Sequence, residues 1–204
     1  MALTIYGSPR SRTMRTLWIA AELRLDYIHE PLTWDDPKLK TPAFLALNPN
    51  GTIPVIVDDG FTLSESLAIN LYLAKKYAAR TTPPIYPASA EGEAEAWRWT
   101  LWAQAHLEPW VQRDALLAGL RDTIGRHADT VVSRALTALD RALTGRNWLT
   151  GDHFTIADFN VACVLSPSRA ASLDLKPYPA VERWLAACYA RPAAVATRHR
   201  FATP

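Results

Sequence analysis

A hydroxyl and an acid stand together at the expected start of a helix, in the pair Glu65-Ser66. The N-terminal N–H groups and dipole of a helix favour an anion there, by about 0.3–1 kcal/mol. The hydroxyl and amide of Ser66 could hold a carboxylate, while Glu65 could pair with an ammonium group. An α-amino acid carries both charges, so the pair predicts a site for one end of a small peptide. Simple capping by Ser64 or Ser66, with Glu65 complementing the dipole, explains the same residues without a ligand.

A second hydroxyl, Ser11, lies between the first apolar run and the first helical pattern. A hydroxyl at a helix start can donate a hydrogen bond to a bound thiolate. A free thiol has a pKa of about 8.5, and lowering it by ~2 units requires about 2.7 kcal/mol of preferential thiolate stabilisation. One charge-assisted hydrogen bond together with a helix end is of that order. Ser8 and Thr13 are competing hydroxyls, and helix capping is the alternative interpretation of Ser11.

A proline, Pro54, interrupts the β-like sequence TIPVIV. Proline cannot donate to a sheet ladder, so its presence indicates an edge strand or a special backbone turn. If the peptide bond before Pro54 is cis, the backbone of Ile53 faces outward and can pair with an extended peptide as an added strand does. An ordinary edge-strand proline is the alternative.

The elements that must position these groups alternate in the first part of the chain between β-type runs and helical spacing. Asp59-Gly60 is a strong hairpin signal between the last two runs. Residues 37–47 predict a polar loop with a short helical turn. The sequence therefore predicts a βαβ unit followed by ββα. The expected strands are Leu3–Tyr6, Tyr27–Leu32, Ile53–Val57 and Phe61–Leu63, and the expected helices cover Met14–Leu25 and Glu65–Tyr77.

A proline-rich segment, Arg80–Pro87, breaks this pattern because proline cannot continue a helix. No convincing strand follows it. The chain is therefore predicted to have an α/β domain over residues 1–79, a linker over 80–88 and an all-α domain over 89–204. The helices expected in the second domain cover residues 91–120, 130–143, 155–166 and 180–190.

One local signal in the second domain predicts a helix start. Thr155 precedes Asp158 by three residues, which is a capping box with Asp in place of the commoner Glu. Phe154 and Phe159 stand at the positions of a hydrophobic staple. The helix that follows is almost wholly apolar, so we interpret this motif as structural.

Composition narrows the function classes. The chain of 204 residues has a net charge of +2 without any basic cluster, which argues against binding nucleic acid or an anionic membrane. It contains neither a secretory signal nor a long apolar stretch. Cys163 and Cys188 lack CxxC spacing, which indicates a reducing, cytoplasmic location. No cluster of His, Cys and Asp has the spacing of a metal site.

Taken together, the motifs resemble those of the cytosolic glutathione transferases over nearly the full length of the chain. The quoted matches are YGSPRSRTMRTLWIAAEL, LNPNGTIPVIVDDGFTLSESLAINLYLAKKY, FTIADF and YPAVERWLAACYARP. The resemblance implies a thioredoxin-like N-terminal domain, an all-helical C-terminal domain and a homodimer. It implies conjugation of glutathione, as co-substrate without a permanent cofactor, to small hydrophobic electrophiles. A glutathione-dependent peroxidase and a non-catalytic binding protein are the alternatives.

The resemblance also implies roles for single residues. Ser11 matches the catalytic hydroxyl of the serine-type classes, similar to theta and phi, whereas Arg12 stands where the bacterial cysteine-type class has its Cys. Leu39 stands where several classes have a His, so the neighbouring Lys40 is expected to contact the glycine carboxylate. The residues expected to bind glutathione are Ser11, Lys40, Ile53, Pro54, Glu65 and Ser66.

An electrophile pocket is expected between the Ser8–Thr13 loop and the first long helix of the second domain. It is expected to involve Ser8, Thr13, Trp102 and His106. Helical spacing places Trp99, Trp102, His106 and Trp110 on one broad face. That face could line an aromatic pocket, although core packing is expected for at least two of the rings. His106 could act on a substrate, or belong to a polar rim or to the core.

Overall fold

The computed structural model describes residues 3–111, 121–166 and 170–202. By its contacts the chain divides into two compact units. The first unit contains the residues up to Tyr86 together with those from Pro192 onward, and the second contains Pro87–Arg191. The division differs from the predicted boundaries because the end of the chain groups with the first unit.

The first unit is built on a four-stranded sheet with the order β2-β1-β3-β4. Strand β1 pairs in parallel with β2, and the pairs β1–β3 and β3–β4 are antiparallel. The central strands place Ile5 and Ile56 in the core, where both are fully buried. The strands are β1 (Leu3–Tyr6), β2 (Tyr27–Glu30), β3 (Val55–Asp58) and β4 (Phe61–Ser64).

The predicted hairpin is confirmed at Asp59-Gly60. Asp58 pairs with Phe61, so Asp59 and Gly60 form the whole loop. Their φ angles of 52° and 83° are the positive values that a type I′ turn requires at both positions. The hairpin fixes β4 at the edge of the sheet, which makes β3 an internal strand.

Pro54 lies immediately before β3, and the peptide bond between Ile53 and Pro54 is cis. The interpretation of Pro54 as an ordinary edge-strand residue is therefore wrong. Because the strand begins at Val55, the missing N–H of Pro54 takes no bond from the ladder.

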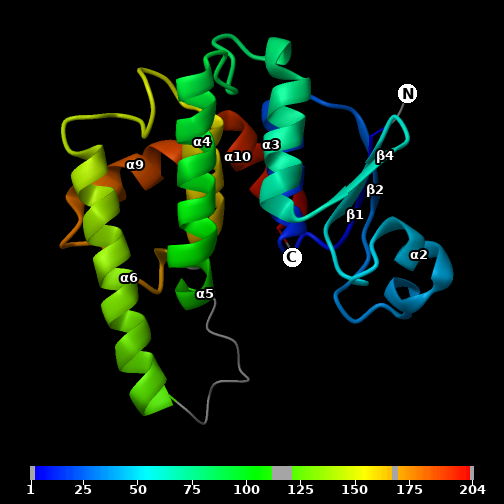
Figure 1. The fold of residues 1–204 in the computed structure, drawn as a ribbon, viewed down its shortest axis with the longest axis horizontal. Coiled ribbons are helices and arrows are strands. Elements are labelled where there is room, and N and C mark those ends of the chain that lie inside the picture. The colour runs from blue at the N-terminus through cyan, green and yellow to red at the C-terminus, as the bar shows by residue number, and fades with distance from the viewer. Residues whose placement is uncertain (1–2, 112–120, 167–169, 203–204) are drawn as a thin grey trace. The chain divides into compact units, whose positions relative to one another are not determined.

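Four helices of the first unit bear on the site: α1 (Thr13–Glu22), α2 (Pro42–Leu47), α3 (Ser66–Lys76) and α10 (Pro192–Phe201). Helix α3 contacts β3 and β4 (Figure 1), while α1 contacts both α3 and α10. Two short 3-10 turns, η1 (Pro37–Lys40) and η2 (Ala78–Arg80), complete the unit. Helix α10 was not predicted, although proline at its first position is a common helix start.

In the second unit, the predicted helix over residues 91–120 is interrupted. Helix α4 (Ala90–Trp102) runs into a π-helical turn, η3 (Ala103–Leu107), and then into α5 (Glu108–Val111). Pro109 has no N–H to donate to a carbonyl four residues earlier, and the π pattern of i→i+5 bonds adjoins this position. The rest of that prediction, residues 112–120, lies outside the described residues.

Helix α7 (Ile156–Leu165) is the centre of the second unit, and all of its residues are buried. It contacts α4, behind which it is drawn in Figure 1, and α9 (Pro179–Tyr189). Helix α6 (Arg121–Leu143) also contacts α9. Across the described part of the chain, none of the helices combines the length and apolarity that crossing a membrane would need.

The predicted capping box of α7 is confirmed. The backbone N–H of Thr155 donates to Asp158 Oδ2 at 3.0 Å, and the reciprocal bond to the Thr155 side chain is also present. Phe154 and Phe159 form the staple, with their ring centroids 6.4 Å apart. The buried start of the central helix is thus satisfied by its own residues.

Candidate functional site

The turn that joins β1 to α1 is organised around the Ser11 hydroxyl. Its Oγ lies 2.7 Å from the Ser8 carbonyl oxygen, which can only accept, so Ser11 donates this bond. A hydroxyl has one proton, and the 2.8 Å contact with Thr13 Oγ1 must therefore be donated by Thr13. The Thr13 N–H also donates to Ser11 Oγ, at 3.1 Å. Two donors from Thr13 thus fix the Ser11 oxygen, while its proton points to Ser8.

This geometry separates the three candidate hydroxyls. Thr13 is fully buried and supports Ser11. Ser8 accepts a hydrogen bond from the Arg10 N–H at 3.2 Å. Ser11 is half-buried, and a rotation of its hydrogen alone would redirect its hydrogen bond while the two bonds from Thr13 persist. Of the three, Ser11 is best arranged to donate to a ligand.

Gly7 joins this turn to the segment before β3. A Cβ built on Gly7 would lie 2.1 Å from Thr13 Oγ1 and 3.0 Å from Ile53 Cβ, and its φ is +132°. No side chain fits between these neighbours, and few residues other than glycine adopt this conformation. The structure therefore brings Ile53 next to the Ser11–Thr13 cluster.

The segment before β3 is held by side chains of the preceding loop. Asn48 Nδ2 donates to the Thr52 carbonyl at 2.8 Å and to the Thr52 hydroxyl at 3.1 Å. The Lys40 ammonium lies 3.5 Å from the Gly51 carbonyl oxygen, so it stands beside the strand edge that Ile53 was predicted to offer. The loop therefore holds the Lys40 ammonium close to the backbone that precedes Ile53.

The start of α3 is open and strained. Glu65 is exposed and occupies the N-cap position with φ 70° and ψ 107°, and its side chain makes no capping hydrogen bond. A positive φ at a residue other than glycine costs free energy and is found most often at functional sites. Ser66, the next residue, is buried. The two residues predicted to hold an amino acid therefore differ in exposure, with Glu65 facing solvent.

A buried cation that the sequence did not predict, Arg15, also lies in this region. It is 5% exposed, and its Nη1 donates to Ser66 Oγ at 3.3 Å. The bond joins the first turn of α1 to the first residue of α3, so two helix N-termini and a guanidinium lie together. All three favour a bound anion. No local sequence signal marked Arg15, because its contact with Ser66 joins residues 51 positions apart.

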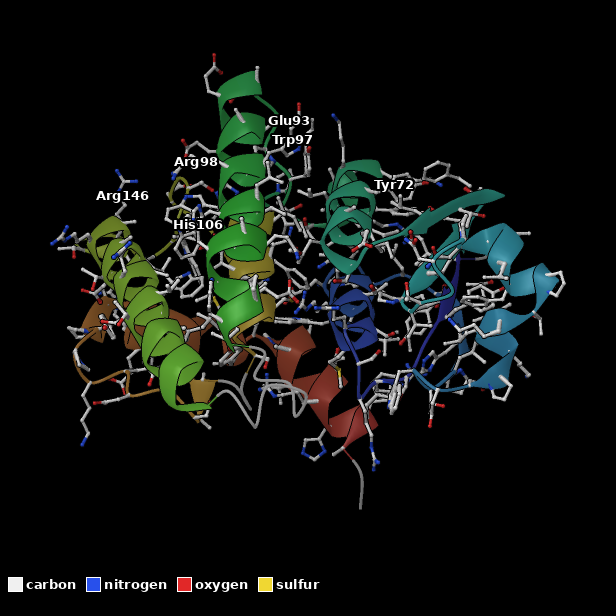
Figure 2. All side chains as sticks on the ribbon, turned by 60° about the horizontal axis from the view of Figure 1, so that its bottom comes forward. Tyr72, Glu93, Trp97, Arg98, His106 and Arg146 are labelled. Atoms are coloured by element: carbon white, nitrogen blue, oxygen red, sulfur yellow. The ribbon has the colours of Figure 1, made fainter. Side chains whose placement is uncertain are left out.

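The residues proposed for an electrophile pocket in the second unit lie in different environments. Trp99 is buried and contacts Trp102 edge to face, with ring centroids 5.2 Å apart. His106 is exposed on the π-helical turn (Figure 2). The prediction that Trp99, Trp102, His106 and Trp110 share one face required an unbroken α-helix. That prediction is wrong, because the π turn changes the spacing between these residues. The pocket itself stays a prediction.

Metal-binding side chains do not gather in the described part of the chain, where no group of three or more His, Cys, Asp or Glu could hold an ion. The site just described consists of hydroxyls, helix N-termini, a guanidinium and an ammonium. Such groups hold anionic and zwitterionic ligands.

Two family models match this sequence. The first, "Glutathione S-transferase, N-terminal domain", covers residues 9–76, and the second, "Glutathione S-transferase, C-terminal domain", covers residues 104–187. The chain belongs to the glutathione S-transferase family.

Known glutathione S-transferases resemble this chain in both sequence and fold. Glutathione S-transferase 3 of Zea mays is 33% identical, with 94% of this chain and 90% of the relative covered. Glutathione S-transferase D7 of Drosophila melanogaster is 30% identical, with 90% and 82% covered. The solved structure of glutathione S-transferase III in apo form superposes with a TM-score of 0.81 at 31% identity, over 100% of this chain and 99% of that one.

These matches confirm the predicted fold, a thioredoxin-like domain followed by a helical domain. The first family model spans every residue predicted to bind glutathione. The roles of those single residues, and the serine-type class, stay predictions for this glutathione S-transferase.

Proposed function

We propose that this glutathione S-transferase conjugates the thiolate of glutathione to small hydrophobic electrophiles. The observation that carries the proposal is the contact between Arg15 and Ser66, which joins two helix N-termini beside a serine hydroxyl. In this arrangement Ser66 and the start of α3 hold the γ-glutamyl carboxylate, and Glu65 pairs with the ammonium group. The backbone of Ile53, beside Pro54, pairs with the cysteinyl part, and Lys40 attracts the glycine carboxylate.

The thiol is activated by the Ser11 hydroxyl. Its hydrogen turns from the Ser8 carbonyl toward the sulfur, while Thr13 continues to donate two hydrogen bonds to the Ser11 oxygen. A thiolate is a charged acceptor and competes well with a neutral carbonyl. Donation from Thr13 also polarises the Ser11 hydroxyl and strengthens the bond that it donates. The thiol proton leaves to solvent.

Conjugation then requires only a correctly placed electrophile. The sulfur forms a bond to an electrophilic carbon, and a leaving group such as halide departs with the electron pair of the broken bond. Holding both reactants together supplies much of the acceleration. No resident cofactor takes part, because glutathione is itself the co-substrate.

Ultraviolet titration of the thiolate in the glutathione complex tests this mechanism. The wild-type midpoint should lie about 2 units below that of free glutathione. Ser11→Ala should raise the midpoint and lower kcat with an aryl halide, whereas Ser8→Ala should change neither. Ser66→Ala should instead weaken glutathione binding. An unchanged midpoint in Ser11→Ala would reject Ser11 as the activating residue.

A non-catalytic glutathione-binding protein is the second candidate. It is favoured by one observation, the 2.7 Å bond that commits the Ser11 proton to the Ser8 carbonyl. If that bond persists in the complex, glutathione binds with an unshifted thiol midpoint and no aryl halide is turned over. Assays with an organic hydroperoxide in the same series test the peroxidase alternative.

A homodimer and a cytoplasmic location belong to the same proposal. Each unit exposes large apolar side chains: Phe61 in the first is 49% exposed, and Trp97 and Leu101 in the second are 50% and 66% exposed. Exposed apolar surface of this kind is typical of association sites. Light scattering should give a dimer mass that Trp97→Ser/Leu101→Ser reduces, and a wild-type monomer would reject the dimer. Two buried free thiols, Cys163 and Cys188, agree with a reducing compartment.

A further inference from the structure

A histidine on the second strand, His29, holds the first residue of the Ser11 turn. Its Nε2 lies 2.8 Å from the Gly7 carbonyl oxygen. A carbonyl can only accept, so Nε2 carries the proton and donates. The Gly7 N–H in turn donates to the Glu30 carbonyl at 2.8 Å. Strand β2 therefore holds the Gly7 peptide through both its N–H and its C=O group.

The imidazole is itself held by the last turn of α10. The rings of His29 and Phe201 meet edge to face, with centroids 5.5 Å apart and an interplanar angle of 80°. The Arg200 guanidinium lies 5.4 Å from the centroid of the Phe201 ring and 5.6 Å from that of Tyr27, which is also on β2. Helix α10 thus orients the His29 ring so that Nε2 meets the Gly7 carbonyl.

Gly7 transmits this constraint to the reactive hydroxyl. The space where its Cβ would lie is filled by Thr13 Oγ1, the atom that donates to Ser11 Oγ. A shift of the Gly7 peptide would therefore move Thr13, and with it the Ser11 oxygen that Thr13 fixes. The path from Phe201 through His29, Gly7 and Thr13 to Ser11 consists only of ring contacts, hydrogen bonds and close packing.

We propose that His29 is a positioning residue for thiolate formation, a role that rests on the proposed function. Its hydrogen bond to the Gly7 carbonyl fixes the turn so that the Ser11 hydroxyl reaches the glutathione sulfur. The ligand contacts assigned to Ile53, Glu65 and Ser66 lie outside this turn. Loss of the His29 bond should therefore lower kcat and leave the KM for glutathione nearly unchanged.

Two substitutions separate the hydrogen bond from the packing of the ring. His29→Phe keeps an aromatic ring against Phe201 and removes the donor, whereas His29→Gln retains a side-chain N–H. His29→Phe should raise the thiolate midpoint and lower kcat by about tenfold to 10²-fold, with the KM for glutathione within about twofold. His29→Gln should recover most of the lost kcat. His199→Phe, at an exposed histidine on α10, is the matched control and should behave as wild type.

Hydrogen exchange gives a readout that does not require turnover. In His29→Phe the amides of Ser11 and Thr13 should exchange faster, while those of β3 keep their wild-type rates. If His29→Phe does not fold, Phe201→Leu, which keeps the donor and loosens the ring, should show the same changes to a smaller extent. A wild-type protein without a shifted thiolate would reject the proposed function itself. A wild-type shift that His29→Phe and Phe201→Leu both retain would reject the positioning role.

Discussion

The starts of α7 and α3 show two different ways of treating the free N–H groups at a helix N-terminus. At α7, Asp158 accepts from the Thr155 N–H through one oxygen and from Leu149 N and Trp184 Nε1 through the other, the last two at 2.8 Å. At α3, the N-cap residue Glu65 makes no side-chain capping bond and has a positive φ. The first helix start is satisfied by its own residues, whereas the second has no hydrogen bond from the side chain of its N-cap residue.

The C-terminal half of α3, like the start of α7, is held by hydrogen bonds to a buried carboxylate. Asp58, at the end of β3, accepts hydrogen bonds from Tyr72, Lys76 and Tyr77, at 2.8–3.0 Å. Tyr72 is seen on α3 in Figure 2. The helix is thus anchored at its C-terminal half and open at its N-terminus. The contacts that anchor α3 and the proposed binding site therefore lie at opposite ends of one helix, and substitutions can test them separately.

The largest effect is expected where the helix start is self-satisfied. Asp158→Ala leaves the buried donors of Leu149, Thr155 and Trp184 without an acceptor, and should lower the free energy of unfolding by about 3–5 kcal/mol. Urea denaturation measures this loss. Asp152→Ala, at an exposed carboxylate nearby, is the control and should change little. A small loss in Asp158→Ala would mean that the capping box contributes little to the fold.

At the open helix start, the main effect should be on ligand affinity. Arg15→Leu removes the buried cation and should weaken glutathione binding by about 1.5–3 kcal/mol, as measured by calorimetry. Arg15→Lys should fall between this variant and wild type, because the charge stays but the planar donor is lost. Arg12→Leu removes an exposed charge from the N-cap of α1 and should shift the affinity by about twofold or less. Equal losses in Arg12→Leu and Arg15→Leu would indicate a long-range charge effect only.

Substitution of Glu65 should move stability and binding in opposite directions. Glu65→Gly relieves the positive φ and should raise the free energy of unfolding by about 0.5–1 kcal/mol. The same change removes the partner of the ligand ammonium group, so glutathione binding should weaken. Glu65→Gln keeps the backbone strain and loses the charge, so it should lose affinity without gaining stability. A stability loss in Glu65→Gly would show that the conformation is not strained.

The contribution of Asp58 to the free energy of unfolding should depend on pH. Burial raises the pKa of the Asp58 carboxyl, but the hydrogen bonds from Lys76, Tyr77 and Tyr72 outweigh it and lower the pKa below its usual 3.8. A carboxyl with a lowered pKa stabilises the fold above its unfolded-state value, and this contribution disappears as the pH falls through the folded pKa. The stability difference between wild type and Asp58→Asn should therefore begin to narrow below about pH 5 and continue to narrow as the pH falls through the folded pKa. Asp35→Asn, at an exposed position, should show no such trend.

Local chemistry explains which features the sequence could predict. The Asp59-Gly60 hairpin and the Thr155–Asp158 capping box depend on residues within a few positions of one another, so their spacing was sufficient. In each case the residue type determines the local backbone geometry almost alone.

Features that depend on distant contacts were not predictable in this way. Arg15 meets Ser66 across 51 positions of sequence, and its burial follows from the packing of α1 on α3. The place of α10 beside α1 likewise arises from tertiary contacts. The π turn before Pro109 was missed because helical periodicity was assumed to continue through the proline.

The crowding at Gly7 has a practical meaning for protein engineers who wish to diversify this scaffold. Every alternative side chain at position 7 would meet Thr13 at 2.1 Å, on a backbone with φ of +132°. Libraries that randomise the whole turn would therefore consist mainly of inactive members. Diversity is better placed at Arg10 and Arg12, whose side chains are exposed on the same turn. Gly7 should therefore be kept unchanged while substrate preference is evolved at other positions of the turn.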